Sequence, residues 1–276
     1  MTGALTIPDP TRVADAMRRI AAEEILPRFD KLEKHEISEK QSGEIVTAAD
    51  LISEKRLTAE LTALLPGSVA VGEEGFAADA ALIEHFSRAA PVWVIDPVDG
   101  TRNFSEGKAI FGVIVALVSG GETRAGWIYD PLGDDMVWGL AGEGVWDATG
   151  RLTLARPART IGVMRGSLAK RPREGMEKMA ASQGTEVPRE MIRYRCVARE
   201  YMELVRGHLD FAVYGQLKPW DHAAGVLLYA EAGGHSAYAA DARPYRPGPA
   251  VDGRYILART EARWTELRDL LTQALS

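Results

Sequence analysis

Between residues 92 and 146 the chain passes through five short apolar segments separated by turns, and this pattern limits the possible folds more than any other feature of the sequence. Residues 92–95 are a continuous apolar run, as expected of a buried strand. The later segments are strand-like, with turn residues such as Gly120-Gly121 between them: they are residues 110–118, 124–129, 135–140 and 144–146. The pattern predicts an antiparallel meander in a fold that mixes α and β structure.

Helices are predicted on both sides of the meander, because apolar residues there recur at helical spacing. They cover residues 10–26, 49–64, 80–88, 196–206, 221–232 and 261–275. In the helix at 49–64 we expect Leu51, Leu57 and Leu61 on the buried side. Further short strands are predicted at residues 68–71, 209–214 and 255–258. This order predicts an α+β half over residues 1–150, with the antiparallel sheet, and an α/β half over residues 151–276.

The composition excludes several classes of protein. Of 276 residues, 46% are hydrophobic and 26% are charged, which is enough apolar material for a sizeable core. The net charge of −6 gives no general attraction to phosphate backbones, so we expect no nucleic-acid binding through bulk charge. No apolar run approaches the roughly 20 residues of a membrane helix. Cys196 is the only cysteine and the first ten residues show no secretory signal, so we expect a cytoplasmic protein without disulfides.

Acidic residues stand at three places where strands end or helices begin, which is where α/β folds build their sites. Glu73 follows one predicted strand, Asp96 and Asp99 follow another, and Asp221 begins a predicted helix. Because Pro97 keeps the residue before it extended, both aspartates can project from one tight turn toward the same point. Carboxylates so close together repel each other unless a cation lies between them. Mg²⁺, which takes oxygen ligands, is the usual solution.

The two residues after these aspartates, Gly100-Thr101, are expected to open a short helix whose free N–H groups hold an anion such as phosphate. A metal beside a helix terminus is what hydrolysis of a phosphomonoester needs, because the cation activates water and stabilises charge on the phosphoryl oxygens. Each cluster alone has an ordinary explanation, as a turn at residues 96–100, a solvated loop at Glu73-Glu74, or a helix N-cap at Asp221. The argument therefore depends on their joint, ordered occurrence.

A competing interpretation is a phosphatase of the haloacid-dehalogenase type, whose nucleophile motif is Asp-x-Asp-Gly-Thr. Here the spacing is one residue longer, in Asp96-Pro97-Val98-Asp99-Gly100-Thr101, which moves the first carboxylate away from in-line attack. We rank this interpretation well below the next one.

Taken together, the acidic segments resemble the inositol monophosphatase family. That family shows D-x-V-T-x-x-D, then G-E-E, then W-[IVL]-[IL]-D-P-[IVL]-D-G-T-x-N-F, then W-D-x-A-A-G. The matching segments here, in the same order and over nearly the whole chain, are residues 44–50, 72–74, 93–104 and 220–225. The resemblance implies a layered αβαβα sandwich, a homodimer, and hydrolysis of a small phosphorylated alcohol or sugar such as inositol 1-phosphate by a water that Mg²⁺ activates.

The resemblance also implies a ligand set for two or three Mg²⁺ ions. Glu73, Asp96 and the carbonyl of Val98 correspond to ligands of the first ion, and Asp96, Asp99 and Asp221 to ligands of the second. Glu73 and Asp99 help to hold a weaker third ion. Most of these ligands fall in the first half of the chain, and Asp221 falls in the second.

For catalysis the resemblance implies that Thr101, paired with Asp50, orients the attacking water near Glu73. Backbone N–H groups of Gly100 and Thr101 would bind the phosphate, and Asp99 would also contact the substrate. No covalent intermediate is needed in such a reaction.

This chain departs from the family where the alcohol portion of the substrate is expected. The glutamate that usually lies seven residues before the aspartate of W-D is replaced by Tyr214, and the family segment G-S-A-A-L-[DN] aligns with residues 195–200. Its Gly-Ser pair is Arg195-Cys196, and its last position is Glu200. We expect Tyr214 and Glu200 near the alcohol portion, and Arg199 or Arg195 near a second anionic group, unless both arginines lie on a solvated helix face.

Several functions remain open at this level. Histidinol phosphate and fructose bisphosphate are alternative substrates. Some bacterial relatives also act as partners of the transcription machinery, so a regulatory binding protein with residual phosphatase activity is an alternative of another class.

Overall fold

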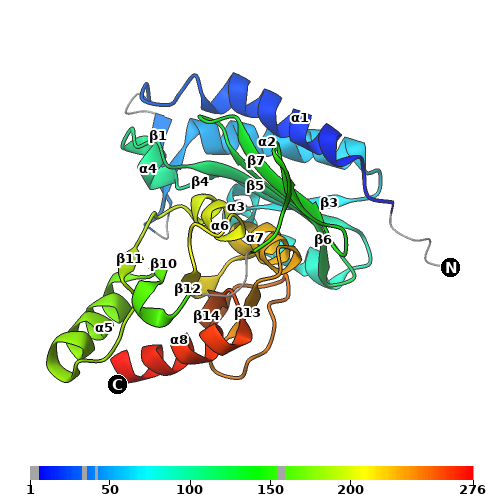
Figure 1. Cartoon of the computed structure of the whole chain (residues 1–276). Helices are drawn as coiled ribbons and strands as arrows, with labels where there is room; N and C mark the ends of the chain where they lie inside the picture. The colour runs from blue at the N-terminus through cyan, green and yellow to red at the C-terminus, as the bar shows by residue number, and fades with distance from the viewer. Residues whose placement is uncertain (1–5, 33–35, 41–42, 155–158, 276) are drawn as a thin grey trace.

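Two large β-sheets, each with helices on both faces, form five layers in the order helices, sheet, helices, sheet, helices (Figure 1). The computed structural model of the chain describes residues 6–32, 36–40, 43–154 and 159–275. The layered αβαβα sandwich that the resemblance implied is confirmed. None of the helices in these ranges has the length and apolar character that a membrane span requires.

The first large sheet has seven strands that lie in the order in which they follow along the chain. They are β3 (Val69–Gly72), β4 (Val92–Asp99), β5 (Gly112–Ser119), β6 (Glu122–Asp130), β7 (Asp135–Leu140), β8 (Gly144–Asp147) and β9 (Gly150–Leu152). Strand β3 pairs with β4 in parallel and every later pair is antiparallel, so the predicted meander is present. Helices α1 (Pro10–Ile20), which continues into a π-helical turn (Ala21–Ile25), and α2 (Ala48–Leu64) cover one face.

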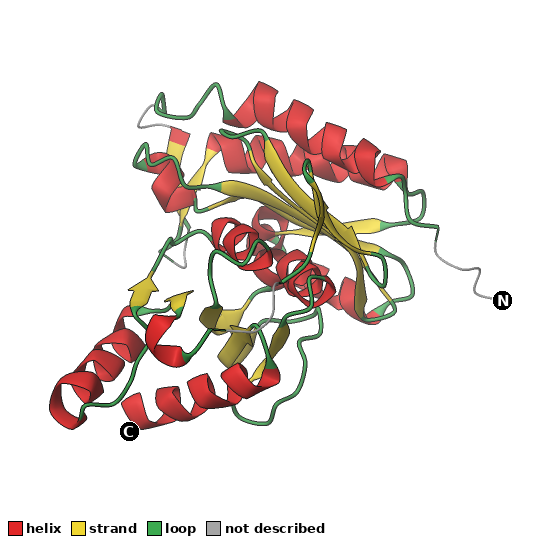
Figure 2. Ribbon diagram, viewed as in Figure 1, coloured by secondary structure: helices red, strands yellow, loops and turns green. Residues whose placement is uncertain are grey.

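The second large sheet has five strands in the order β11 (Glu190–Ile192), β10 (Arg165–Ser167), β12 (Phe211–Leu217), β14 (Val251–Ala258) and β13 (His235–Tyr238). Helices α6 (Val197–Val205) and α7 (Pro219–Glu231) lie between the two sheets, and α5 (Lys170–Gln183) and α8 (Glu261–Ala274) cover the outer face (Figure 2). One apolar cluster includes residues from both sheets and both middle helices. The two predicted halves therefore share a core, while their division at residue 150 stays a prediction.

Short elements at one end of the first sheet differ most from the expectations. Strands β1 (Ile37–Glu39) and β2 (Ile45–Thr47) pair with each other, α3 (Glu73–Ala78) begins directly after β3, and α4 (Thr101–Ser105) follows β4. Residues 80–88, predicted to be an α-helix, form a 3₁₀ helix (Ala80–Ser87) with no buried residue. A further 3₁₀ turn (Ile161–Val163) precedes β10.

Helix α2 has a buried face that the sequence pattern did not identify fully. Leu57 and Leu61 are buried as expected, but Leu51 is 54% exposed, so its predicted position was wrong. The first turns bury Asp50 and Glu54 instead, one turn apart on the same face. The apolar pattern failed because this end of the helix packs against polar groups: Asp50 bonds to Thr47 and Thr101, and Glu54 bonds to the start of α3.

Strand β4 contains one extra residue near its end. Its register moves from Asp96 opposite Ile114 to Asp99 opposite Gly112, so three residues of β4 span two of β5. Val94 packs between the sheets whereas Val98 packs under α1 and α2, although a regular strand would place both on one face. The bulge thus reverses the alternation of side chains between the two faces of the sheet. As a result Asp96 and Asp99, three residues apart, line the same cavity.

The last glycine of the W-D-x-A-A-G segment, Gly225, lets α7 pack closely against α6. A Cβ at this position would lie 2.1 Å from the ring of Tyr201, which is fully buried. We expect Gly225→Ala to lower the free energy of unfolding by about 1–3 kcal/mol, because the crowded ring must move. Urea denaturation would measure this, with Gly248→Ala as the control, since a Cβ there meets nothing. Equal midpoints for the two variants would contradict the expectation.

Candidate active site

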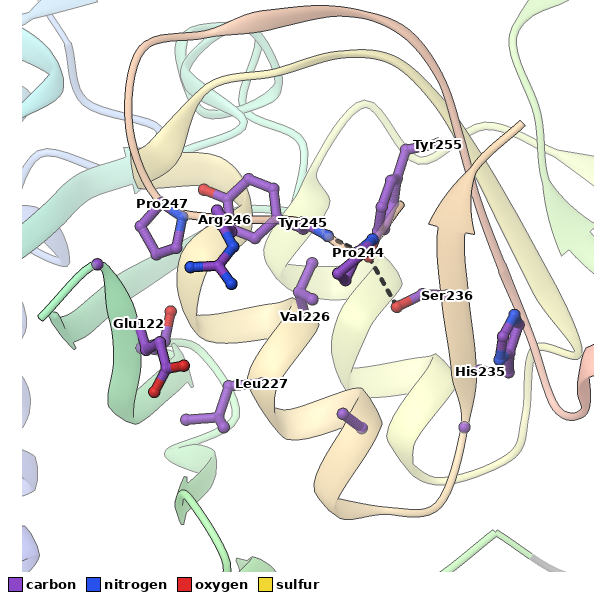
Figure 3. A pocket seen from close by; sticks show the side chains of 14 residues that line it. Glu122, Val226, Leu227, His235, Ser236, Pro244, Tyr245, Arg246, Pro247 and Tyr255 are labelled. Carbon is purple, nitrogen blue, oxygen red and sulfur yellow. Dashed lines mark hydrogen bonds between the residues drawn. The ribbon is translucent and has the colours of Figure 1, made fainter. Parts of the chain in front are cut away.

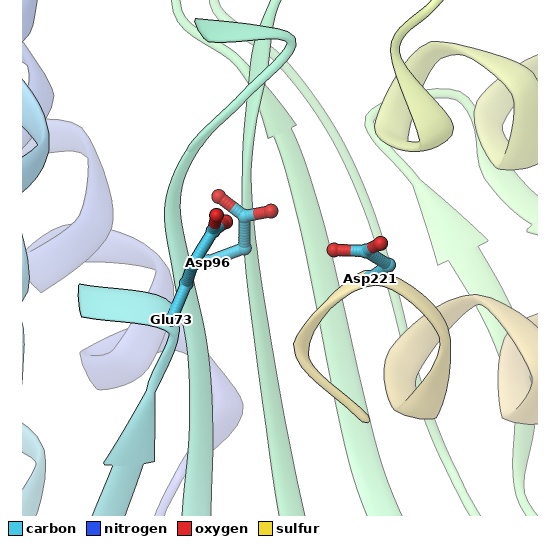
Figure 4. Close-up of side chains that lie close together, drawn as sticks. All are labelled: Glu73, Asp96 and Asp221. Atoms are coloured by element: carbon cyan, nitrogen blue, oxygen red, sulfur yellow. The ribbon is translucent and has the colours of Figure 1, made fainter. Parts of the chain in front are cut away.

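Three carboxylates from separate parts of the chain meet at the end of the first sheet. Glu73 is the first residue of α3, Asp96 lies in β4, and Asp221 lies in the first turn of α7. Figure 4 shows Glu73 beside Asp96, with Asp221 facing them from α7. One oxygen of each lies within 4.8 Å of the others. The structure therefore brings together acidic residues that lie far apart in the sequence.

Burial makes this arrangement of charges unfavourable without a cation. Loss of solvent, and then repulsion from Glu73 and Asp99, raises the pKa values of Asp96 and Asp221 well above the usual range. Burial also raises the pKa of Asp99 to about 6, although the Ala198 N–H group opposes the shift. A hard divalent cation with oxygen ligands would stabilise the charged forms. The donor set therefore fits a metal such as Mg²⁺.

The bulge in β4 also fixes the groups around these carboxylates. The backbone N–H of Val98 donates to the Asp96 carboxylate at 3.1 Å, and its carbonyl accepts from the Thr101 hydroxyl at 2.9 Å. The Asp99 carboxylate accepts from the N–H of Ala198 at 2.6 Å, at the start of α6. Asp99 is thereby held by a helix that belongs to the second half of the chain.

Thr101 and Asp50 contact each other across two elements. The Thr101 Oγ1 lies 3.2 Å from Asp50 Oδ1, while Asp50 Oδ2 accepts from the backbone N–H and the hydroxyl of Thr47 at 2.8 and 2.6 Å. Burial raises the pKa of Asp50 to about 7. Gly100, between Asp99 and Thr101, has φ +86°, and a Cβ there would lie 3.0 Å from the carbonyl oxygen of Ile110. The turn into α4 therefore requires glycine.

Lys40 and Glu54 are among the ionisable residues of this region that were missed in the sequence. The Lys40 ammonium donates to Glu73 and Glu74 at 2.8 and 2.7 Å. Glu54 accepts from the backbone N–H groups of Glu74 and Gly75 at 2.8 and 2.6 Å, which closes the start of α3. The spacing of four residues between Asp50 and Glu54 was an available signal for one helix face. No spacing or pattern pointed to Lys40.

Two cavities that share lining residues, among them Asp99 and Asp221, lie beside these groups. The smaller, of about 240 Å³, is lined by Glu73, Asp96, Asp99, Gly100, Thr101 and Asp221, and the larger, of about 540 Å³, by Glu200 and Tyr214. The Ser167 hydroxyl donates to the buried Glu200 carboxylate at 2.6 Å. The predicted ligand and catalytic residues thus adjoin the predicted residues for the alcohol portion.

Arg199 does not join them, in contrast to the sequence-based expectation. Its guanidinium pairs with Glu203 at 3.0 Å and lies 3.7 Å from Asp130, and it lines neither cavity. The N-terminus of α6 faces the cavity, but its third residue points toward β6. Arg195, which precedes the helix, lines both cavities instead.

Glu200 gives the protein a pH-dependent stability that can be measured. Burial raises its pKa to about 7 from an ordinary value of 4.5. Since the folded protein holds this proton to higher pH than the unfolded chain, folding loses stability as the pH rises between these values. As the pH rises from 4.5 to about 7, we expect the free energy of unfolding to fall by about 3 kcal/mol more in the wild type than in Glu200→Gln. Urea denaturation from pH 4.5 to 8 in EDTA would show this, and parallel curves would refute it.

A third cavity, of about 420 Å³, lies beside α7 and is lined by residues that include Glu122, Ser236, Tyr245, Arg246 and Tyr255 (Figure 3). The hydroxyl groups of Ser236 and Tyr255 bond to each other at 2.9 Å. None of the predicted site residues lines this cavity. The acidic cluster and the cleft beside it therefore remain the candidate site.

Comparisons with known proteins agree with the geometry. A sequence model of the inositol monophosphatase family matches residues 9–274. A protein of Aquifex aeolicus named fructose-1,6-bisphosphatase/inositol-1-monophosphatase is 31% identical over 210 residues, which are 75% of this chain and 76% of that protein. The Nus factor SuhB of Vibrio cholerae is 27% identical over 225 residues, 80% of this chain and 82% of its own. A solved IMPase structure from Thermotoga maritima has a TM-score of 0.79 at 21% identity, and the match covers 95% of this chain and 96% of that one.

Proposed function

Because the chain belongs to the inositol monophosphatase family, we propose that this phosphatase hydrolyses a small phosphorylated alcohol or sugar with Mg²⁺ as its cofactor. The observation that carries the proposal is the group of three carboxylates within 4.8 Å of one another, beside the hydrogen-bonded pair of Thr101 and Asp50. The three carboxylates and Thr101 line the smaller cavity, and Asp221 also lines the larger one with Glu200 and Tyr214, where the alcohol portion would lie.

The residues around the acidic cluster would hold two or three Mg²⁺ ions. Glu73, Asp96 and the carbonyl of Val98 form one ligand set, and Asp96, Asp99 and Asp221 form the other. When bound, Mg²⁺ supplies a Lewis acid that lowers the pKa of water and neutralises charge on the phosphoryl oxygens. The buried, mutually repelling carboxylates support this assignment.

The chain's own groups would orient the reactants. The Thr101 proton is directed at the Asp50 carboxylate or the Val98 carbonyl, so the hydroxyl oxygen is left to accept a hydrogen bond from the attacking water. Glu73 would accept the proton that the same water loses as its oxygen bonds to phosphorus, in line with the departing oxygen. Backbone N–H groups of Gly100 and Thr101 would hold the phosphate. The departing alkoxide would take its proton from a water beside Asp221.

Phosphate release from a panel of esters tests this proposal. The panel would contain inositol 1-phosphate, histidinol phosphate, fructose bisphosphate and glycerol phosphate, each with Mg²⁺ and with EDTA. We expect Mg²⁺-dependent release that one compound dominates, and the dominant compound names the substrate. If no ester is hydrolysed although Mg²⁺ binds, the proposal fails.

A second candidate function is supported by the similarity to the SuhB protein of Vibrio cholerae, which is named a Nus factor. On this alternative the chain also binds a component of the transcription machinery. Such binding should persist in Asp96→Asn, because a contact surface does not need the cation. Absence of binding to purified transcription complexes would remove this candidate.

We also propose that the protein forms a homodimer, as the family resemblance implies. Light scattering should then give about twice the chain mass of 30.0 kDa. A mass near that of one chain would overturn this assignment.

A further inference from the structure

The larger cavity carries a group of arginines that the proposed chemistry does not use. Arg102, Arg193 and Arg195 all line it, and Arg102 and Arg195 also line the smaller cavity beside the carboxylates. The two cavities share Asp99 and Asp221 as well. A substrate whose phosphate lies at the acidic cluster would therefore extend its alcohol portion past these guanidinium groups.

None of the three guanidinium groups forms an ion pair with a carboxylate of the described residues. Neighbouring arginines behave differently, because Arg199 pairs with Glu203 and Arg165 with Glu190. Glu106 lies near Arg102 and Arg195 but pairs with Lys108. The three guanidinium groups thus border one cavity without an ion-pair partner among the described residues. The same cavity is lined by Glu44, Glu200, Asp99 and Asp221, of which Asp99 and Asp221 would be neutralised by the proposed metal ions. An anion beside the arginines would then meet their positive charge.

The segment that carries Arg193 and Arg195 is fixed to the catalytic turn. The side-chain amide of Asn103 donates to the carbonyl oxygen of Tyr194 at 3.0 Å and lies 3.3 Å from that of Arg195. Asn103 is 4% exposed and stands two residues after Thr101. The arginine-bearing segment is therefore held at a constant position relative to the groups that act on the phosphate, as specificity requires.

The backbone of Arg195 is in an unfavourable conformation. Its φ is +57°, in the left-handed region that favours glycine, and the family motif has glycine at this position. A residue held in such a conformation is a common feature of functional sites. Glycine would relieve the strain but would remove the positive charge that Arg195 places beside both cavities.

The same cavity is lined by Glu200, Ser167 and Tyr214, which offer hydrogen bonds to hydroxyl groups. Glu200 and Ser167 are buried and Tyr214 is half-buried, whereas the three arginines are exposed. The cavity therefore has two kinds of lining. The hydroxyl and carboxyl groups suit a polyol. The arginines suit a phosphate or carboxylate, whose shape a guanidinium group matches with two hydrogen bonds.

We propose that Arg193 and Arg195, together with Arg102, bind a second anionic group of the substrate, so that this enzyme prefers phosphomonoesters that carry a further phosphate or carboxylate. The inference rests on the proposed phosphatase function, which it narrows to doubly anionic substrates. The three arginines determine specificity and take no part in breaking the phosphate ester.

Two pairs of compounds on matched scaffolds test the proposal and distinguish the two anions. Inositol 1,4-bisphosphate is compared with inositol 1-phosphate, and 3-phosphoglycerate with glycerol 3-phosphate, as initial kcat/KM with Mg²⁺. We expect a preference for the doubly anionic member of one pair, and the pair that shows it identifies the second anion. In the double variant Arg193→Gln/Arg195→Gly this preference should fall about 10- to 100-fold, while the rate with the singly charged partner stays within about threefold.

The variants are chosen so that misfolding cannot imitate the result. Glycine suits the backbone of residue 195, and the thermal unfolding midpoint of the double variant should match that of the wild type. The matched control is Arg189→Gln, an exposed arginine just before β11 that lines neither cavity. This control variant should leave the ratio of kcat/KM values between the two members of each pair unchanged.

The outcomes separate this inference from the proposed function. If the wild type hydrolyses the esters but shows no preference, or if the double variant keeps it, the arginine site is refuted and the phosphatase stands. If the wild type hydrolyses none of the four compounds, the proposed function fails, and the same compounds are titrated by calorimetry with Mg²⁺. Tighter binding of a doubly anionic member that the double variant loses then supports the arginine site, and equal binding overturns it.

Discussion

Asp96→Asn should reduce Mg²⁺-dependent phosphate release by about 1,000-fold or more and still leave the metal-free protein at least as stable as the wild type. A bound cation supplies several kcal/mol of stabilisation to the reacting phosphoryl group, and each 1.36 kcal/mol corresponds to tenfold in rate. Asp96 belongs to both proposed ligand sets, so its loss disturbs both. In metal-free protein, however, the substitution removes a buried charge that burial and four neighbouring acids disfavour.

Two measurements on the same variant test this expectation. Phosphate release gives the loss of activity, and thermal unfolding with EDTA and with Mg²⁺ gives the stability. The wild type should gain thermal stability with Mg²⁺, and Asp96→Asn should not. Asp15→Asn, on an exposed part of α1, serves as the control. An Asp96→Asn protein that is inactive only because it is unfolded in EDTA would contradict the argument.

Thr101→Val should lower kcat by about 100- to 1,000-fold with little change in KM or in the Mg²⁺ requirement. Valine keeps the shape of threonine but lacks the hydroxyl that lies between Asp50 and the Val98 carbonyl. Without that oxygen the attacking water loses a hydrogen-bond acceptor that positions it, and misplacing a reacting group by about 1 Å can cost about 100-fold in rate.

Thr101→Ser separates this role from a purely structural one. It restores the hydroxyl without the methyl group, so its kcat should return to within about tenfold of the wild type. Steady-state kinetics across a range of Mg²⁺ concentrations would measure all three proteins. Equal losses in the serine and valine variants would show that shape, and not the hydroxyl, matters at this position.

Much of the fold could be predicted because the central strands and the long helices carry strong patterns of their own. The apolar run at the start of β4 and the hairpins after it are recognisable without knowledge of their neighbours. Strands β10 and β11 have three residues each, and the polar helix α5 precedes β11; none of them was predicted. Such elements are set by the sheet and the core against which they pack, so their own sequences hold little signal.

The residues of the candidate site likewise divide into those that a local pattern reveals and those that only the fold brings to the site. Motif spacing pointed to the acidic residues and Thr101, which the fold brings to one cavity. Lys40 was missed because it comes from a segment without a recognisable pattern, and Arg193 because its neighbours in space are distant in sequence. Arg199 was misplaced because the direction of a side chain at the start of a helix depends on how that helix is rotated. Rotation of α6 is set by Asp99 and by the core, and no local pattern reports it.

The extra residue in β4 also changes what the main chain does. Val98 has no partner residue in β5, so its peptide groups are released from the sheet: the N–H bonds to Asp96 and the carbonyl bonds to Thr101. A single residue therefore links mechanically the carboxylate that would bind the cation to the hydroxyl that would aim the water. Any shift of Asp96 on binding a cation should be transmitted to Thr101 through this residue, so that the two halves of the catalytic apparatus become aligned in one movement.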